Sequence, residues 1–131
     1  MNFDHIGIFC KNLKIGRNYF SKIFEIKKKS KEFSDNLLNV KIQFLYDKKR
    51  IKYELIEPLG KKNPVDLSLR KNKNIINHIA YKTKSFQKEI SRLRKIGCIP
   101  LDKPKPAVAF NGKKVIFFLT PLRFIIELIE N

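Results

Sequence analysis

The segment Phe3-Asp4-His5-Ile6-Gly7-Ile8 occurs again, with substitutions, as Ile76-Asn77-His78-Ile79-Ala80-Tyr81. The two histidines are 73 positions apart, and the same offset carries Tyr53-Glu54-Leu55-Ile56-Glu57 onto Ile126-Glu127-Leu128-Ile129-Glu130. One offset that holds without gaps across separate segments indicates an internal repeat. We therefore expect two halves that fold alike.

Each half contains the same predicted order of elements, which is a strand, a helix and then three strands. The apolar strands Phe3–Cys10 and Ile75–Lys82 begin the two halves, and period-two alternation predicts the later strands. These later strands are expected at 31–33, 40–46 and 51–57 in the first half, and at 99–101, 114–119 and 123–129 in the second. The pattern predicts an α+β fold of two tandem β-α-β-β-β modules, about 1–57 and 75–131, whose curved sheets form a cleft.

Apolar residues at helical spacing predict the buried face of each helix, and a polar cap precedes each one. A linker is expected at 58–74, where Asn63-Pro64 reads as a cap followed by proline and predicts a short helix over Val65–Arg70. The first helix follows Asn12 with a stripe of Leu13, Ile15, Tyr19, Phe20, Ile23 and Phe24; the second follows Ser85 with Phe86, Ile90, Leu93 and Ile96 and ends at Gly97.

The formal net charge of +17 arises from 29 Lys and Arg residues against 12 Asp and Glu residues. Such a charge is typical of proteins that bind nucleic acid, but no groove-reading or base-stacking motif accompanies it. The basic residues are also spread along the whole chain. We interpret the charge first as a solvated surface with a compositional bias, second as steering of an anionic small molecule or an acyl carrier protein, and last as a nucleic-acid surface.

The cysteines and the hydropathy profile indicate where the chain is located. Cys10 and Cys98 have no paired spacing, so we expect reduced thiols rather than a disulfide or a thiolate metal site. No apolar run is long enough to cross a bilayer, and no signal peptide is visible. We expect a cytoplasmic protein that does not associate with a membrane.

Two kinds of polar residue interrupt the predicted strands at equivalent positions. In the first strand, Ile6 and Ile8 would face the helix and leave His5 and Gly7 on the opposite face; the repeat puts His78 and Ala80 in the same places. Glu54 and Glu127 interrupt apolar strands, where a carboxylate is costly unless it is paired or bound to a metal. Two imidazoles and two carboxylates suit one divalent ion such as Co²⁺, Ni²⁺, Mn²⁺ or Zn²⁺. The predicted ligands are His5, Glu54, His78 and Glu127.

These segments resemble the vicinal oxygen chelate superfamily of glyoxalases, bleomycin resistance proteins and dioxygenases, and within it the methylmalonyl-CoA epimerases. The resemblance is carried by Asp4–Ile8, Tyr53–Gly60, Asn77–Tyr81 and Ile125–Leu128. It implies a single glyoxalase-like domain over 1–131, whose four ligands leave coordination positions open for substrate oxygens. The linker also resembles that of the epimerases more than that of glyoxalase I, although glyoxalase I shares the ligand order.

The resemblance implies a metal-dependent isomerase or epimerase that acts through an enolate on an acyl thioester. Glu127 is the first candidate for the general base, because a ligand that loosens could accept the proton. Some family epimerases present a second carboxylate from the strand that here holds Lys41 and Gln43, and the nearest acids are Asp35 and Asp47. The alternatives are a glyoxalase I-like lactoylglutathione lyase and a metal-free binding protein of the bleomycin-resistance type.

The same resemblance implies which region binds the substrate. Basic and aromatic residues there could contact a coenzyme A or phosphopantetheine arm, so the expected partner is a small-molecule acyl thioester or an acyl carrier protein. The acyl group, the native metal and a homodimeric state stay open. The candidate substrate-binding residues are Lys105, Phe110, Lys113, Lys114 and Arg123.

Overall fold

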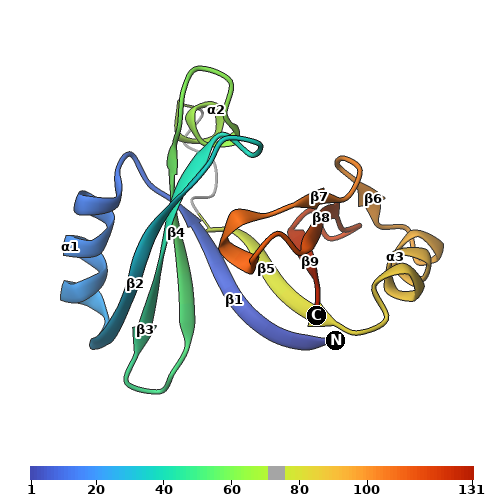
Figure 1. Ribbon diagram of the computed structural model, residues 1–131, viewed down its shortest axis with the longest axis horizontal. Helices are drawn as coiled ribbons and strands as arrows, with labels where there is room; N and C mark the ends of the chain where they lie inside the picture. The colour runs from blue at the N-terminus through green and yellow to red at the C-terminus, as the bar shows by residue number, and fades with distance from the viewer. Residues whose placement is uncertain (71–75) are drawn as a thin grey trace. The chain divides into compact units, whose positions relative to one another are not determined.

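The computed structural model describes residues 1–70 and 76–131 of the chain (Figure 1). The chain divides into two compact units. The N-terminal unit comprises His5–Asn77, and the C-terminal unit comprises Met1–Asp4 together with His78–Asn131. The boundary therefore falls inside the first strand as well as near the predicted linker. The predicted strand start at Ile75 and the end of that linker lie outside the described residues.

The N-terminal unit is a sheet with one long helix against one of its faces (Figure 1). The strands lie in the order β2-β3-β4-β1, where β1 runs parallel to β4 and the other neighbours are antiparallel. The elements are β1 (Asn2–Phe9), α1 (Leu13–Ile23), β2 (Ile26–Asp35), β3 (Val40–Asp47), β4 (Lys52–Pro58) and α2 (Pro64–Arg70).

Both helices of this unit begin at a predicted asparagine cap. The Asn12 side chain accepts a hydrogen bond of 2.8 Å from the Ile15 N–H, which satisfies a backbone donor that the first turn leaves open. At α2, the Asn63 side-chain oxygen accepts bonds of 3.0 and 2.9 Å from the N–H groups of Val65 and Asp66. The short helix predicted in the linker is thereby confirmed.

The apolar stripe predicted for α1 is wrong in part. Ile15, Tyr19 and Ile23 are 46%, 61% and 67% exposed, and the buried positions of the helix are Leu13 and Gly16. A Cβ atom on Gly16 would lie within 3.1 Å of both Cys10 Sγ and Leu55 Cδ1. The helix therefore approaches the sheet most closely at a glycine, which a count of apolar residues does not register.

The C-terminal unit repeats this arrangement around a second helix. Its strands lie in the order β5-β9-β8-β6, with β7 also paired to β8, and β5 runs parallel to β9. The elements are β5 (Ile76–Thr83), α3 (Phe86–Lys95), β6 (Ile99–Pro100), β7 (Lys105–Pro106), a 3-10 turn (Val108–Phe110), β8 (Lys114–Leu119) and β9 (Ile125–Glu130).

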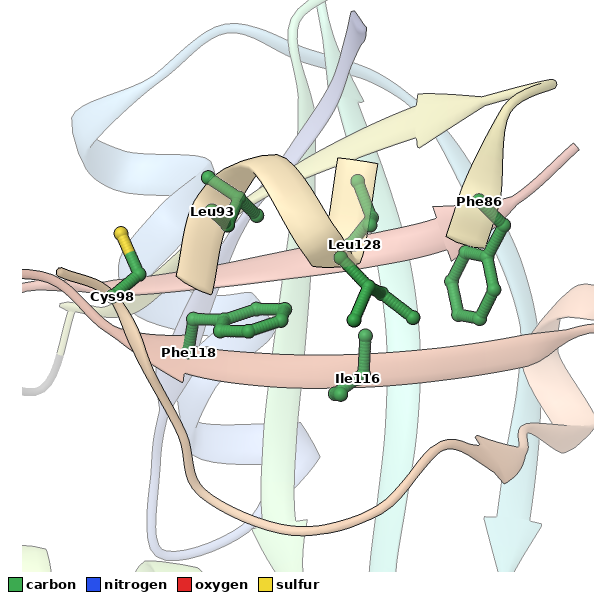
Figure 2. Close-up of a cluster of buried hydrophobic side chains, with 7 residues drawn as sticks. Phe86, Leu93, Cys98, Ile116, Phe118 and Leu128 are labelled. Carbon is green, nitrogen blue, oxygen red and sulfur yellow. The ribbon is translucent and has the colours of Figure 1, made fainter. Parts of the chain in front are cut away.

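Helix α3 packs on β8 and β9 through a continuous apolar cluster, which Figure 2 shows. Ile116 and Phe118 alternate along β8, so that both side chains point to the helix, and Leu128 on β9 joins them. The members of the cluster are Phe86, Ile90, Leu93, Cys98, Ile116, Phe118 and Leu128. The equivalent cluster under α1 contains Ile8, Leu13, Leu45, Tyr53 and Leu55.

The two units share one strand register, which confirms the repeat seen in the sequence. Gly7 pairs with Glu54 between β1 and β4, and Ala80 pairs with Glu127 between β5 and β9. Phe44 and Phe117 pair with the same two glutamates from the antiparallel side. The offset of 73 residues therefore holds in each of these pairings.

The observed strands also differ from the predicted ones in where they begin and end. The strand predicted at 31–33 extends over Ile26–Asp35 with register shifts against β3. The last strand begins at Ile125 rather than at Arg123, because the Thr120 N–H donates to the Phe124 carbonyl and closes a turn. Within the described residues, no helix combines the length and hydropathy needed to cross a bilayer.

Candidate metal centre

In the N-terminal unit, the first predicted histidine meets the first predicted glutamate. His5 Nε2 lies 3.1 Å from Glu54 Oε2, and both side chains are buried. His5 also meets the ring of Phe44 edge-on, with ring centroids 5.7 Å apart. All three project from the sheet face opposite α1, because they alternate with residues of the cluster under that helix. We call this surface the pair face of the N-terminal unit.

The C-terminal unit contains the same arrangement. His78 Nε2 lies 3.1 Å from Glu127 Oε2, both side chains are buried, and the ring of Phe117 meets His78 edge-on at 5.3 Å. These residues lie on the face opposite α3, which is the pair face of this unit. Each of the three is 73 residues from its counterpart. The repeat thus extends from the backbone to the side chains of the predicted metal ligands.

The donor set of each pair fits a divalent metal. Ligand atoms about 2.0–2.2 Å from one ion, at tetrahedral or octahedral angles, lie roughly 3 Å from each other. The His–Glu separation of 3.1 Å in each unit matches this spacing. A buried carboxylate is costly unless a cation or hydrogen-bond donors stabilise it, and an imidazole beside it completes a nitrogen–oxygen set that suits Zn²⁺, Co²⁺, Ni²⁺ or Mn²⁺. The residues present therefore fit such an ion.

Much of the rest of the N-terminal pair face is apolar. It contains Phe9, Val40, Ile42, Phe44 and Ile56, all buried and all in alternate positions of their strands. No carboxylate projects from β3 onto this face, since Val40, Ile42 and Phe44 occupy the positions that could present one. This part of the site is thus shaped for packing and contains no second base on β3.

Lys41 and Gln43 lie on the opposite face of the sheet, under α1. Gln43 accepts a hydrogen bond of 2.9 Å from Arg17 and donates one of 2.7 Å to the Ser30 carbonyl. Lys41 lies 3.3 Å from Glu32. The Arg17 bond joins α1 to the sheet, the other two contacts join β3 to β2, and all three lie away from the pair face.

The two acids considered as alternative bases support turns. Asp35 Oδ1 accepts from the N–H groups of Leu37 and Leu38 at 3.1 and 3.0 Å. Asp47 Oδ1 accepts from the N–H groups of Lys49 and Ile51, each at 2.9 Å. Backbone bonds of this kind hold the carboxylates in place at the strand ends.

The five candidate substrate-binding residues all belong to the C-terminal unit but lie in different settings. Lys105 is on β7, forms an ion pair with Asp102 and shares a face with Val115 and Phe117. Lys114 alternates with Val115 and so lies on the α3 side. Lys113 and Arg123 are exposed in turns.

Phe110 is the buried member of this set. It is 8% exposed, and Lys82 Nζ lies 5.8 Å from the centre of its ring. Phe110 therefore stabilises the turn in which it lies. Of the basic candidates on strands, the register leaves Lys105 on the same face as Glu127.

Neither cysteine has the properties of a metal ligand. Burial raises the pKa of the Cys10 thiol to about 11, assisted by the nearby charge of Glu57, so that it stays protonated at neutral pH. Cys98 is a member of the apolar cluster under α3. A ligand set of nitrogen and oxygen atoms is therefore the relevant one.

The sequence reasoning missed the aromatic partner of each histidine. Phe44 and Phe117 fix the ring orientation of His5 and His78 by edge contacts. The offset alone could have identified them, because both lie in the repeated run 42–45 and 115–118 and pair directly with the glutamates.

The chain is similar in sequence and in fold to known proteins. The uncharacterized protein YqjC of Bacillus subtilis is 29% identical over 114 residues, which cover 87% of this chain and 79% of that protein. Methylmalonyl-CoA epimerase from Mycobacterium tuberculosis has the same fold, with a TM-score of 0.81 at 19% identity over 98% of this chain and 87% of that one.

A methylmalonyl-CoA epimerase from Streptomyces coelicolor, solved in complex with 2-nitronate-propionyl-CoA, gives a TM-score of 0.75 at 21% identity over 100% of this chain and 94% of that one. At these identities the two epimerase structures establish a shared α+β fold. The profile of the Glyoxalase/Bleomycin resistance protein/Dioxygenase superfamily matches residues 4–117. The chain therefore belongs to the glyoxalase/bleomycin resistance/dioxygenase superfamily, the vicinal oxygen chelate proteins.

Proposed function

We propose that this chain is a divalent-metal-dependent isomerase or epimerase that acts through an enolate on an acyl thioester. The observation that carries the proposal is the repeated pair, in which each unit buries a His Nε2 at 3.1 Å from a Glu Oε2 in the same register. Its repetition with identical residues supports a shared ligand.

The proposal takes residues 1–131 as one functional domain and His5, Glu54, His78 and Glu127 as the ligands of one ion. Co²⁺, Ni²⁺, Mn²⁺ and Zn²⁺ all suit two imidazoles and two carboxylates. When bound, the ion would act as a Lewis acid toward the substrate carbonyl and stabilise negative charge on its oxygen. The apolar residues of the N-terminal pair face, such as Ile42 and Phe44, would exclude water around it.

Glu127 is the proposed general base. Its carboxylate would accept the proton from the carbon α to the thioester, and that C–H electron pair would pass into the enolate. Return of a proton to the opposite face of the carbon gives the epimer, and return to a neighbouring carbon gives an isomer. Either outcome regenerates the carboxylate of Glu127.

The acyl thioester is proposed because the epimerase from Streptomyces coelicolor was solved with 2-nitronate-propionyl-CoA. Cationic side chains near the pair face of the C-terminal unit, with Lys105 first among them, are proposed to contact the phosphates of coenzyme A or of a carrier protein's phosphopantetheine. Phe110, Lys113, Lys114 and Arg123 are the further candidates. Of these, Lys113 and Arg123 are exposed in turns, which would suit contact with the outer part of such an arm.

Metal content tests the proposal first. Elemental analysis after reconstitution with Co²⁺ or Ni²⁺ is expected to give one ion per chain. Glu54→Ala and Glu127→Ala should each abolish binding. The matched control is Glu130→Gln, three residues along β9 on its other face, which should retain the ion. Two ions per chain would show that each pair binds its own, and none would refute a metal-dependent activity.

Solvent exchange then tests the chemistry. With metal present, the wild type should incorporate deuterium from D₂O at the α-carbon of one or more acyl-CoA or acyl-carrier thioesters, as followed by mass spectrometry. A glutathione hemithioacetal of methylglyoxal serves as the comparison substrate. Exchange into none of the thioesters, in protein that holds its ion, would refute the isomerase assignment.

A further inference from the structure

One row of exposed side chains on helix α1 is apolar along its whole length. Ile15, Tyr19 and Ile23 follow one another at intervals of four residues, and all three are exposed. Residues four apart lie one above the other on the same side of a helix. The row therefore extends along about 12 Å of the helix surface, at a rise of about 1.5 Å per residue. We call it the apolar row of α1.

The rows on the two sides of the apolar row differ in character. On one side, Lys14, Asn18 and Lys22 also follow at intervals of four residues, and all three are exposed. On the other side, Phe20 packs on the sheet, with its ring centroid 5.3 Å from that of Tyr53. The apolar row thus lies between a row that carries two positive charges and the packed face of the helix.

The positive charge beside the apolar row is not balanced by nearby acids. Helix α1 contains no acidic residue. Among residues 1–70 and 76–131, neither Lys14 nor Lys22 forms an ion pair, and Lys22 Nζ lies 5.4 Å from the centre of the Tyr19 ring. A partner with carboxylates would therefore meet two lysines that have no ion pair to break.

The second half of the repeat shows that the fold does not require an exposed apolar row. The residues 73 positions after Ile15 and Tyr19 are Lys88 and Arg92, which are both exposed on α3. Arg92 donates a hydrogen bond of 2.8 Å to Glu89 on the same helix. This side of α3 is thus mostly charged, as is usual for the exposed side of a helix. Contiguous exposed apolar residues on α1 instead indicate an interaction surface.

Charge and geometry together indicate which kind of partner this surface fits. A second copy of the chain would bring the same lysines against each other, and each chain has a formal net charge of +17. Nucleic acid would bind the lysines but not the apolar row. A helix that lies in a lipid surface buries its main apolar face there, whereas that face of α1 packs on the sheet. An apolar row with charges along its edge matches a contact between two helices.

We propose that α1 binds an amphipathic helix of a partner protein. The apolar side chains of that helix pack on Ile15, Tyr19 and Ile23, and its Asp or Glu side chains face Lys14 and Lys22. The docking surface is independent of the proposed function. Helix α1 covers one face of its sheet (Figure 1), and the predicted ligands of the N-terminal unit project from the opposite face.

Three synthetic helical peptides test the proposal, with binding to the full chain measured by fluorescence anisotropy. The first peptide has leucines at the a and d positions of a heptad and glutamates beside them; the second has glutamine and the third has lysine in place of every glutamate. The acidic peptide should bind, the glutamine peptide should bind about fivefold more weakly, and the lysine peptide should not bind. Equal affinity for the acidic and the glutamine peptide would overturn the proposal.

Serine substitutions test whether the apolar row is the binding surface. Ile15→Ser and Tyr19→Ser should each weaken binding of the acidic peptide by about tenfold, because each removes an apolar anchor of the contact. The matched control is Ile96→Ser on α3, since Ile96 is 73 positions after Ile23 and is 57% exposed against 67%. The control should change the affinity less than twofold. An equal loss in the control would overturn the proposal.

A lysine variant and two further measurements separate the charge contact from other occupants of the surface. Lys22→Gln should weaken binding of the acidic peptide but not of the glutamine peptide, and an equal loss for both would contradict the charge contact. Binding to phosphatidylserine vesicles that Tyr19→Ser abolishes, without binding of the acidic peptide, would overturn the proposal in favour of a lipid surface. A dimer that the same variant dissociates in sedimentation would overturn it in favour of a second copy.

Discussion

The contact between helix and sheet uses different residues in the two units, whereas the central residues of their pair faces are the same. In the N-terminal unit, Arg17 on α1 donates to Glu32 and to Gln43, each at 2.9 Å. The residues 73 positions after Arg17 and Gln43 are Ile90 and Ile116, two members of the apolar cluster under α3. On the opposite face, His5, Phe44 and Glu54 match His78, Phe117 and Glu127 one for one.

This comparison shows which positions the fold allows to vary and which positions are the same in both candidate ligand pairs. The backbone accepts either a hydrogen-bonded polar pair or two isoleucines at one contact, because both fill the space and leave no donor unmet. The pair face shows no such freedom in its three central residues. Local packing can therefore be exchanged between the halves, whereas the His–Phe–Glu set identifies the positions where chemistry is expected.

The largest expected effect is a difference in solvent-exchange rate between variants of the two glutamates, Glu127 and Glu54. Glu127→Gln should lower the rate of solvent exchange by about 10³-fold, because the amide can still coordinate through its oxygen but cannot accept a proton. Glu54→Gln should lower it by roughly tenfold or less, since it loses charge alone. Rates are compared in D₂O by mass spectrometry on variants shown to hold one ion. Equal losses would show that the two halves share the proton transfer.

Equivalent substitutions in the two apolar clusters should lower the free energy of unfolding by similar amounts. Leu55 and Leu128 are equivalent in the repeat, and both are fully buried. Leu55→Ala and Leu128→Ala should each lower the free energy of unfolding by about 3 kcal/mol, from lost burial and the cavity that remains. Urea titrations followed by circular dichroism measure both. A loss in one variant at least three times that in the other would contradict the equivalence of the two clusters.

An exchange of residues between the halves should have a smaller effect. Arg17→Ile alone should lower the free energy of unfolding by about 1–2 kcal/mol, because it leaves the Gln43 side chain without one of its hydrogen bonds. Adding Gln43→Ile introduces the isoleucine pair of the C-terminal unit and should recover most of that loss. The same urea titrations apply. If the double variant is less stable than the single one, the two contacts are not interchangeable.

The smallest effect concerns the exposed carboxylate of this contact. The hydrogen bond from Arg17, followed by that from Lys41, lowers the pKa of Glu32 below its ordinary value of 4.5. A lowered folded-state pKa contributes stability above the ordinary value, and the contribution is lost as the pH falls through the lowered one. In Arg17→Ile, the pKa of Glu32 should rise toward 4.5 in a carboxyl-detected NMR titration. An unchanged pKa would contradict the role of Arg17.

The repeat made the fold and the two His–Glu pairs predictable from the sequence. Features that depend on packing between elements, such as the buried face of α1, were not predictable. His5, Glu54, His78 and Glu127 could be found because one offset selects them, and within each unit the structure confirms the expected His–Glu neighbours. That all four bind one ion remains a prediction. The stripe on α1 failed because the close approach at Gly16 shifts the buried face, which depends on Cys10 and Leu55 in other elements.

The sequence also could not predict the role of a side chain where that role depends on how two strands pair. Lys52 and Lys114 look alike in a list of basic residues, but the register puts one beside His5 and the other on the α3 side of its sheet. Strand ends such as Ile125 were misplaced by two residues, because a turn hydrogen bond at Thr120 decides where pairing begins. Each of these features requires a partner that local pattern does not identify.

The placement of the two thiols makes the chain its own reporter of local opening. Cys10 lies in the N-terminal unit against Gly16, and Cys98 lies in the cluster of the C-terminal unit. Cys98 is buried and Cys10 is half-buried. Labelling of Cys98 therefore requires the C-terminal unit to open, and a change in the labelling rate of Cys10, resolved by peptide mass, would report a change in the exposure of the N-terminal unit. If the addition of metal slows the labelling of both cysteines by the same factor, the two units open as one cooperative structure, and no engineered cysteine is needed to show it.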